Sequence, residues 1–166
     1  MKKQHLDGAS KKDIRVLLHN IRSAHNVGAI FRTADALGVS HIYLSGYTPT
    51  PFDQFLRPVK EIAKTALGAE LTIPWEYAKS PAKFLRASKK EGRKIVGVEL
   101  DSRAIDYKTY VPEQHTLIVM GNEVRGLSPS LRTHCNVLLE IPMRGKKESL
   151  NVATAFGVIL FRLFDK

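Results

Sequence analysis

Three clusters of polar residues stand at positions where buried strands should end. The first covers Asn20–Gly38 and carries Arg32 in a helix-like stretch. The second, Met120–Ser128, places a charged tip between two glycines, directly after the most apolar strand of the chain. The third, Ile141–Ala155, runs from a strand end through a basic loop into a helix start rich in small residues. Ligands of open parallel sheets bind beyond the carboxyl ends of the strands, so these clusters are candidates for a binding site.

Each polar residue of these clusters also has a plain structural explanation. Asn26 can cap a helix, and Asp35, three residues after Arg32, can hold its guanidinium on the helix surface. Ser149 suits the N-cap of the last helix, and Asn151 would then lie in its first turn. Taken one at a time, these side chains are explained by caps, surface ion pairs and solvation. Only the combination of the three clusters favours chemistry.

Several other kinds of site are excluded by their missing motifs. No G-x-G-x-x-G follows a strand, and Gly145-Lys146-Lys147 lacks the upstream Gly and the Ser or Thr of a phosphate loop. No G-x-S-x-G elbow is present, and the histidines show no metal-ligand spacing, so no metal site is expected. Cys135 is the only cysteine, which excludes an intramolecular disulfide and favours buried packing over a catalytic thiol.

The composition says more about the binding partner of the protein than about its fold. The 166 residues, 43% of them hydrophobic, suit one domain of ordinary size. Lys and Arg number 26 against 16 Asp and Glu, a net charge of +10, which favours RNA or DNA over an anionic membrane as partner. No apolar run approaches the roughly 18 residues of a membrane span, and the start of the chain lacks the apolar segment of a secretory signal. We therefore expect no membrane association and a cytoplasmic location.

The elements that must position the clusters alternate along the chain. Apolar runs predict strands at Ile14–His19, Ser40–Ser45, Glu70–Ile73, Lys94–Leu100, Thr116–Gly121 and Val137–Ile141. Helices are expected at His25–Leu37, Val59–Leu67, Pro81–Glu91, Ser128–His134 and Leu150–Phe164, with an irregular loop over 46–58. This order predicts an α/β domain, a mostly parallel sheet with helices on both faces, over residues 14–166. Residues 1–13 form a basic lead-in.

The last of these helices carries two apolar stripes instead of the single stripe of a surface helix. One consists of Leu150, Ala153, Gly157, Leu160 and Phe164, and the other of Val152, Phe156, Ile159 and Leu163. One stripe should face the sheet of its own domain. The second stripe predicts either a self-complementary dimer contact or a helix central to its own domain.

Together, the three clusters resemble the signature motifs of the SpoU/TrmH group of SPOUT RNA methyltransferases. Order and spacing match over Asn20–Gly38, Val119–Leu127 and Ile141–Gly157. The resemblance implies a SPOUT fold, whose C-terminal part is tied in a deep trefoil knot, and a homodimer. It also implies methyl transfer from the cofactor S-adenosylmethionine to a ribose 2′-hydroxyl of RNA, with tRNA slightly favoured over rRNA.

The same resemblance implies a set of catalytic residues. Arg32 would act on the ribose hydroxyl, either as general base or as a charged group that stabilises the developing alkoxide, and both roles stay open. Glu123 would position RNA or Arg32 at the dimer interface. Ser149 and Asn151 would orient the substrate and Arg32 through hydrogen bonds, with Asn26 in support.

Cofactor and RNA contacts are implied at further positions. The cofactor would bind in the knot crevice, against Leu100, Gly121, Ile141, Met143 and Leu150. Many family members carry an additional N-terminal RNA-binding domain that we do not expect here, so the catalytic dimer itself should grip RNA. The basic loop of Arg144, Lys146 and Lys147 is the favoured contact. The alternative is a basic face made of Lys79, Lys83, Arg86, Lys89, Lys90, Arg93 and Lys94.

Two other functions remain compatible with the sequence. The first is a non-catalytic RNA-binding or RNA-chaperone domain, which the joint presence of Arg32, Glu123, Ser149 and Asn151 disfavours. The second is a SPOUT enzyme that methylates a base nitrogen, which the Ser149–Ala155 pattern disfavours.

Overall fold

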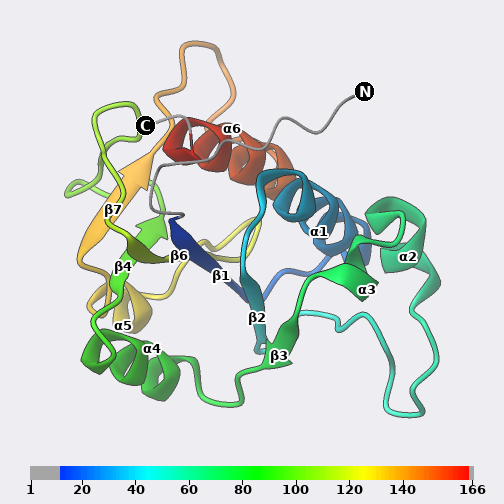
Figure 1. The fold of residues 1–166 in the computed structure, drawn as a ribbon. Coiled ribbons are helices and arrows are strands. Elements are labelled where there is room, and N and C mark those ends of the chain that lie inside the picture. The colour runs from blue at the N-terminus through cyan, green and yellow to red at the C-terminus, as the bar shows by residue number, and fades with distance from the viewer. Residues whose placement is uncertain (1–11, 165–166) are drawn as a thin grey trace, which may run out of the picture.

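A sheet of parallel strands divides the molecule into two helical layers (Figure 1). The computed structural model describes residues 12–164. Within them the sheet has seven strands in the order β3-β2-β1-β6-β4-β7-β5, and every neighbouring pair is parallel. The strands are β1 (Asp13–His19), β2 (His41–Ser45), β3 (Trp75–Tyr77), β4 (Lys94–Val98), β5 (Ile105–Asp106), β6 (His115–Met120) and β7 (Val137–Glu140).

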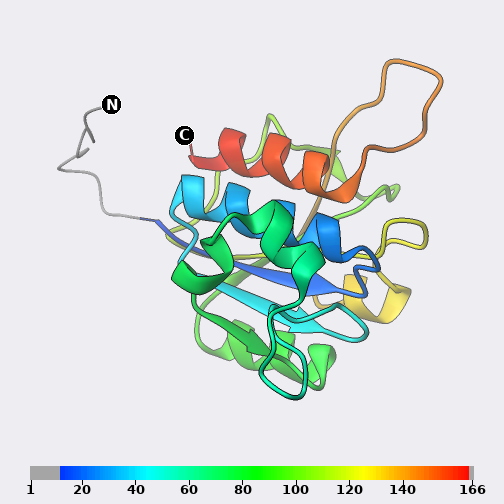
Figure 2. The same cartoon turned by 90° about the vertical axis from the view of Figure 1, so that its right-hand side faces the viewer.

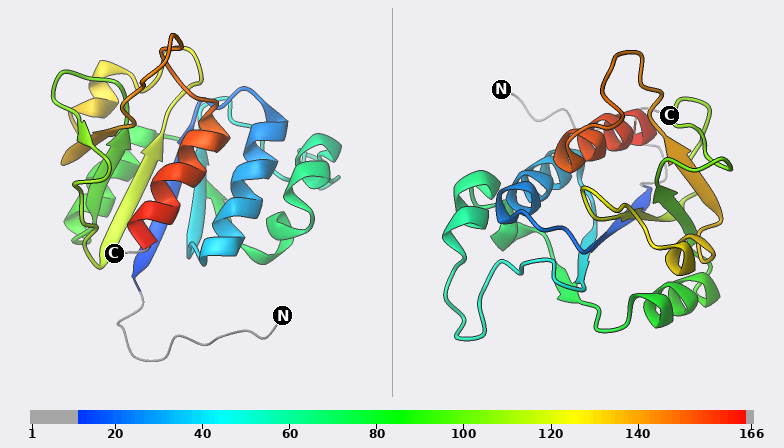
Figure 3. Two further views of the ribbon diagram at one scale, coloured as in Figure 1. Left: turned by 90° about the horizontal axis from the view of Figure 1, so that it is seen from above. Right: turned by 180° about the vertical axis from the view of Figure 1, so that it is seen from behind.

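Helices cover both faces of this sheet (Figures 1 and 3). On one face lie α1 (Ala24–Leu37), α2 (Lys60–Ala66), α3 (Ala69–Thr72) and α6 (Val152–Phe164). On the other face lie α4 (Pro81–Lys90) and α5 (Pro129–Arg132). The predicted α/β class, with helices on both faces, is therefore confirmed. None of the helices within residues 12–164 is long and apolar enough to cross a bilayer.

Helices pack on both faces of the sheet because the side chains of each strand point alternately into two hydrophobic cores. Ile14, Val16 and Leu18 of β1 pack with α1 and α6 in the larger core. Leu17 points the other way, into the smaller core with α4 and α5. A strand that is apolar on both faces can only be buried between two helical layers, which is why its sequence reads as a continuous apolar run.

One predicted strand is wrong and two short strands were not predicted. Residues 70–73 belong to α3 and its end and not to a strand, while β3 and β5 are the additional strands. Gly68 precedes α3 with φ of 93°. The backbone N–H of Gly68 donates a hydrogen bond to the carboxylate of Glu70 at 3.0 Å. This local turn chemistry overrides the apolar alternation of a four-residue run, which is too short to distinguish helix from strand.

The last helix also differs from the expectation. Its stripe of Val152, Phe156, Ile159 and Leu163 is buried in the core of its own domain, and Phe156 and Ile159 are fully inaccessible. The interpretation of this stripe as a dimer contact is therefore wrong. The surface that α6 leaves open instead carries Phe161, which is 51% exposed.

The topology brings the three polar clusters together at the carboxyl ends of the strands. The strands β1, β6, β4 and β7 are consecutive neighbours, so the loops after β1, β6 and β7 all leave from the same side (Figure 2). At the amino ends of the strands, β1 begins at Asp13, one residue before the predicted start. Residues 1–11 of the predicted lead-in lie outside the described part of the chain. The deep trefoil knot stays a prediction.

Candidate active site

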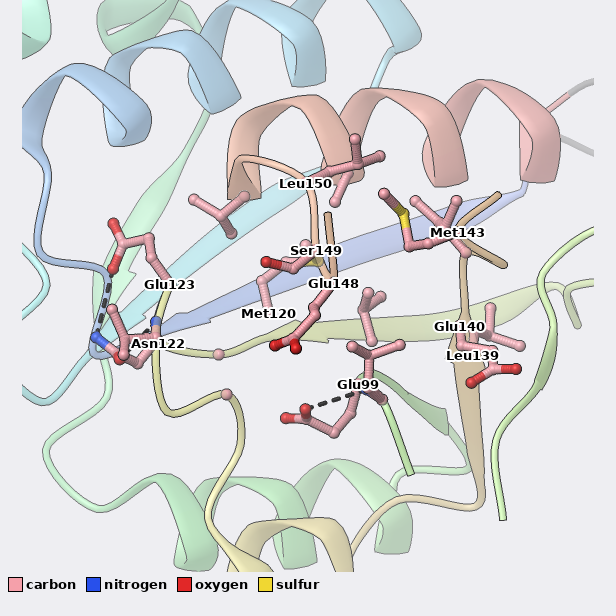
Figure 4. Close-up of a pocket in the computed structure, with 18 residues that line it drawn as sticks. Glu99, Met120, Asn122, Glu123, Leu139, Glu140, Met143, Glu148, Ser149 and Leu150 are labelled. Atoms are coloured by element: carbon pink, nitrogen blue, oxygen red, sulfur yellow. Dashed lines mark hydrogen bonds between the residues drawn. The ribbon is translucent and has the colours of Figure 1, made fainter. Parts of the chain in front are cut away.

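A cavity of about 240 Å³ opens at the carboxyl ends of β4, β6 and β7 (Figure 4). The loop that enters α6 closes its upper side, with Ser149 and Leu150 among the lining residues. All five positions implied for the cofactor lie in its wall, namely Leu100, Gly121, Ile141, Met143 and Leu150. They come from three separate loops, so only the folded chain brings them together.

Two glycines and one carboxylate fix the loop after β6. At Gly121 a Cβ atom would lie 2.6 Å from the backbone of Gly126 and Leu127, so only glycine allows this close approach. Gly126 has φ of 63°, and its missing side chain leaves the space that the carboxylate of Glu99 occupies. Glu99 accepts hydrogen bonds from the backbone N–H groups of Leu127 and, at 3.1 Å, of Leu100. The loop is thereby tied to the end of β4 while Glu99 lines the cavity.

Glu123, at the tip of this loop, binds the start of α1. Its carboxylate accepts hydrogen bonds from the backbone N–H groups of Arg22 and Ser23 at 3.1–3.2 Å. The side-chain amides of Asn26 and Asn122 donate to it at 3.2 and 3.4 Å. Burial opposes ionisation, but these donors outweigh it, and the pKa of Glu123 lies below its ordinary value. Glu123 is therefore an anion whose described partners are uncharged donors.

Asn26 and Asn151 extend this contact to the third cluster. Asn26 donates to Glu123 through Nδ2, and its Oδ1 accepts from Nδ2 of Asn151 at 3.1 Å. The two bonds span 97 and 125 positions of the chain. The three clusters are thus joined by the hydrogen-bonded series Glu123–Asn26–Asn151, which we call the amide link.

Both predicted helix caps are displaced from the expected residues. Ser23, not Asn26, caps α1, and its side chain accepts from the backbone of Asn26. Asn151, not Ser149, caps α6, because its Oδ1 accepts from Ala153 N at 2.9 Å and from Thr154 N at 3.3 Å. Asn151 therefore stabilises the helix with its oxygen and leaves its nitrogen for the amide link.

The remaining catalytic candidates are not part of the amide link. Ser149 is exposed and lines the cavity, whereas Arg32 lies on the exposed outer side of α1 and is absent from the cavity wall. The expected ion pair between Arg32 and Asp35 does not form, because Asp35 accepts from the hydroxyl of Thr72 at 2.9 Å. Within residues 12–164 Arg32 has no hydrogen-bonding or ion-pair partner, so its guanidinium is available.

The two predicted basic surfaces differ in how many of their cations form ion pairs. Arg144, Lys146 and Lys147 are exposed on the loop between β7 and α6. In the alternative face Arg93 pairs with Asp13 at 2.6 Å and Lys94 with Glu113 at 3.1 Å. Two of the seven cations of that face are therefore neutralised, which favours the loop.

Three residues of the site were not singled out by sequence reasoning. Glu99 anchors the loop after β6, and Asn122 Nδ2 donates to Asn20 O at 3.0 Å. Asn20, the residue after β1, has φ of 58°, a conformation that asparagine tolerates better than most residues. The only signal for Asn20 and Asn122 was their place directly after predicted strands, and Glu99 lay inside the predicted strand Lys94–Leu100. No further signal was present in the sequence because the loops that these residues hold are remote from them in the chain.

Metal and thiol chemistry receive no support from the described residues. No group of three or more His, Cys, Asp and Glu that could hold a metal lies within residues 12–164. Cys135 packs against the smaller core, and burial raises the pKa of its thiol to about 11. A thiol of that pKa is a poor nucleophile at neutral pH, in keeping with a packing role.

Comparison with known proteins places this geometry in one family. The sequence profile of the SpoU rRNA Methylase family matches residues 13–161. The chain is 34% identical over 155 residues to the 23S rRNA (guanosine-2′-O-)-methyltransferase RlmB of Neisseria meningitidis serogroup B, a match that covers 93% of this chain and 59% of that protein. It is 30% identical over 151 residues to the tRNA (guanosine(18)-2′-O)-methyltransferase of Aquifex aeolicus, covering 91% of this chain and 68% of that protein.

A solved structure is similar over nearly the whole chain. The AdoMet-bound rRNA methyltransferase from Sinorhizobium meliloti superposes with a TM-score of 0.82 at 33% identity, over 95% of this chain and 58% of that one. The chain thus spans about three fifths of the length of the RlmB protein and of this structure.

Proposed function

The chain belongs to the SpoU rRNA Methylase family, and on this premise we propose that it transfers a methyl group from S-adenosylmethionine to a ribose 2′-hydroxyl of RNA. The observation that carries the proposal is the amide link beside the cavity. It joins the three motif clusters into one polar surface next to a pocket of suitable size. The named activities of the rRNA and tRNA relatives support the same reaction.

The cavity fits this cofactor in shape and charge. Leu100, Ile141 and Leu150 offer apolar surface for an adenine ring, and the missing side chain of Gly121 lets backbone amides approach its polar edge. Carboxylates of Glu99, Glu140 and Glu148 also line the cavity, which suits an organic cation in an otherwise basic protein. When bound, S-adenosylmethionine supplies a methyl group that its sulfonium makes electrophilic.

The residues around the cavity would orient the hydroxyl and manage its proton. Ser149 can hydrogen-bond the ribose, since it lines the cavity with an exposed hydroxyl. Glu123 keeps its negative charge beside the substrate, and the amide link holds it in place. Arg32 would stabilise the alkoxide that develops as the hydroxyl loses its proton, a role that suits a permanently charged guanidinium. General-base action by Arg32 is the alternative.

The position of Arg32 leads to a proposal about the oligomer. Arg32 is exposed on α1, which packs beside α6, and both helices cover the same face of the sheet (Figure 3). The open side of α6 presents Phe161, which is 51% exposed. We propose that a second copy of the chain covers this α1–α6 surface and that Arg32 meets the substrate at that interface.

Substitution of an exposed aromatic residue tests this interface. Phe161→Asp should give monomers of unchanged fold, because a carboxylate in a protein interface is strongly unfavourable. Phe55→Asp, at a 66% exposed phenylalanine on the distant 46–58 loop, is the matched control and should leave the dimer intact. A stable dimer of Phe161→Asp in analytical ultracentrifugation would refute this placement.

The reaction itself is tested by incubating the protein with total RNA and tritiated S-adenosylmethionine. Labelled RNA separated by size and then digested to nucleosides should yield a 2′-O-methylated product. A base-methylated product would support the alternative SPOUT chemistry. Cofactor binding without any labelled RNA, or no cofactor binding in calorimetry, would support a non-catalytic RNA-binding domain.

The size separation also decides between tRNA and rRNA. Relatives that act on 23S rRNA and relatives that act on tRNA match this chain at 34% and 30% identity, too close to choose between them. Both substrates therefore remain within the proposal, with tRNA as the sequence-based preference. Either substrate agrees with a cytoplasmic location.

A further inference from the structure

An exposed tyrosine stands beside the amide link and has no role in the function proposed so far. Tyr47 follows β2, in the turn that lies next to the connection between β1 and α1 (Figure 2). It is 55% exposed, although aromatic side chains usually bury most of their surface. It does not line the cavity.

Tyr47 is fixed at both its backbone and its hydroxyl. Its backbone N–H donates to Oδ1 of Asn20 at 3.2 Å, and its hydroxyl accepts from Nδ2 of Asn122 at 3.0 Å. The next residue, Thr48, is 3% exposed and accepts from Ile21 N at 3.1 Å, so the turn is anchored to the β1–α1 connection. The ring is therefore held in one orientation while its surface stays open to solvent.

The same amide connects Tyr47 to the candidate active site. Asn122 Nδ2 approaches both Tyr47 and the carboxylate of Glu123, at 3.0 and 3.4 Å. A group resting on the tyrosine ring would thus lie next to Glu123, which is where the proposed function places the ribose.

The segments that are hydrogen-bonded to Asn122 and Glu123, beside Tyr47, carry cations and apolar surface. Arg22 and Arg125 are exposed, and only their backbone N–H groups are bonded, to Glu123 and Asn122, within residues 12–164. Val124, the residue before Arg125, is 84% exposed and adds apolar surface. Exposed aromatic rings flanked by arginines suit unpaired nucleotides, because the ring stacks on a base and the guanidinium groups bind phosphates.

We propose that Tyr47 is a stacking platform for a nucleobase of the RNA substrate at or next to the methylated nucleotide, with Arg22 and Arg125 on the flanking phosphates. The inference rests on the proposed function and names the part of the RNA that this surface takes, an unpaired base. Rigid presentation of the ring lowers the conformational cost of binding, since the free protein already holds the bound orientation.

Two substitutions separate the ring from its hydroxyl. Tyr47→Leu keeps apolar volume but removes the stacking surface, and should raise the KM for RNA about tenfold, as loss of one base–aromatic contact does. Tyr47→Phe keeps the ring and loses only the bond to Asn122, and should stay within about threefold of the wild type. Cofactor affinity and Tm should be unchanged in both. Phe55→Leu, at another exposed aromatic of the same loop, is the control and should match the wild type.

An abasic RNA gives a direct readout of stacking. Once the methylated nucleotide is mapped, RNAs with an abasic position there or at either neighbour are bound to wild type and Tyr47→Leu. At one of these positions the abasic change should cost the wild type about tenfold in Kd and cost Tyr47→Leu almost nothing, because both changes remove the same contact.

The outcomes distinguish this inference from the function on which it rests. If the wild type neither binds nor methylates RNA, the proposed function fails. If the wild type methylates RNA and Tyr47→Leu behaves as wild type, only the platform is refuted. The platform is also refuted if Tyr47→Phe or Phe55→Leu loses as much RNA affinity as Tyr47→Leu. Additive effects of Tyr47→Leu and every abasic RNA would refute it as well.

Discussion

The two ends of the sheet hold their carboxylates in opposite ways. At the amino end, Asp13 pairs with Arg93 at 2.6 Å and with Arg15 at 3.4 Å, and it accepts from the hydroxyl of Ser40 at 2.5 Å. At the carboxyl end, Glu123 accepts from backbone N–H groups and side-chain amides. Both carboxylates are ionised, but only Asp13 is neutralised by cations.

The pKa values of both carboxylates are lowered, for different reasons. Burial raises the pKa of Asp13, but the Ser40 hydroxyl and the Arg93 guanidinium outweigh it and hold the pKa far below its usual range. For Glu123, burial is outweighed by the backbone N–H groups of Arg22 and Ser23. The amino end is thus a closed charge network that stabilises the fold.

The carboxyl end, in contrast, keeps its charges available. The guanidinium groups of Arg22 and Arg125, and that of Arg32 on α1, have no carboxylate partner within residues 12–164. This holds although Glu123 binds the backbone of Arg22 and lies two residues before Arg125 in the chain. Holding an anion with uncharged donors leaves the neighbouring guanidinium groups free to bind a polyanion. This contrast implies that one end of the sheet serves stability and that the other, on the proposed function, binds RNA. Substitutions at the two ends should separate these effects.

The largest effect is expected for Arg32→Ala. Loss of the guanidinium should lower the single-turnover rate of methyl transfer about 100-fold or more, because a charge that stabilises the transition state is removed. S-adenosylmethionine affinity should stay within a few-fold and Tm should not change, since Arg32 is exposed and outside the cavity wall. Lys64→Ala, at an exposed lysine of α2 outside both predicted basic surfaces, is the control. A variant that retains most of the wild-type rate would remove Arg32 from catalysis.

Asp13→Asn should show the opposite pattern, with stability lost and rate retained. Removal of the charged partner of Arg93 should lower the free energy of unfolding by about 2 kcal/mol at pH 7. The folded pKa of Asp13 is depressed, so its contribution is present above the unfolded value of about 4 and is lost as pH falls through the folded pKa. The difference in urea unfolding between wild type and variant should therefore shrink progressively as pH falls below about 4. A constant difference down to the lowest accessible pH would contradict the charge network.

Glu123→Gln sharpens the comparison at the carboxyl end. An amide can present only one acceptor oxygen to the donors that now share the carboxylate. We expect the rate to fall about tenfold, equivalent to about 1.4 kcal/mol, with a loss of stability of about 1 kcal/mol. Steady-state kinetics and thermal unfolding of the same preparations measure both. A larger loss of stability than in Asp13→Asn would show that Glu123 serves mainly the fold.

The smallest effect is expected from the basic loop. Lys146→Ala with Lys147→Ala should raise the KM for RNA a few-fold and leave the saturated rate and the KM for the cofactor unchanged. Each lost phosphate contact should reduce the slope of log affinity against log salt by roughly one unit, about two for the pair. Titrations at several salt concentrations distinguish lost charge from altered folding. An unchanged slope would mean that the loop is merely solvated and that the α4 face, with Lys83 and Lys90, carries the RNA.

Much of the fold could be predicted because its signals are local. Continuous apolar runs identified β1, β2, β4, β6 and β7, since a strand covered on both faces must be apolar throughout. Residues 70–73 were mistaken for a strand because a short apolar run carries no clear period, and the turn at Gly68 decides its geometry. The stripe containing Phe156 was seen correctly as buried, but its cover was the chain's own sheet.

Local patterning in the sequence was enough to place the three polar clusters at one end of the sheet, because hydrophobic runs and polar strand ends are local properties of the chain. The positions in the cavity wall were implied by the family resemblance. Leu100, Gly121 and Leu150 do line one cavity. The pairings, in contrast, follow from the folded chain: Asn26 with Asn151, Glu99 with the loop after β6, and Asp35 with Thr72 instead of Arg32. A side chain forms its hydrogen bond with a partner that is near in space. For residues up to 125 positions apart, strand order and helix packing decide which partner is near, and the local spacing of residues does not encode this.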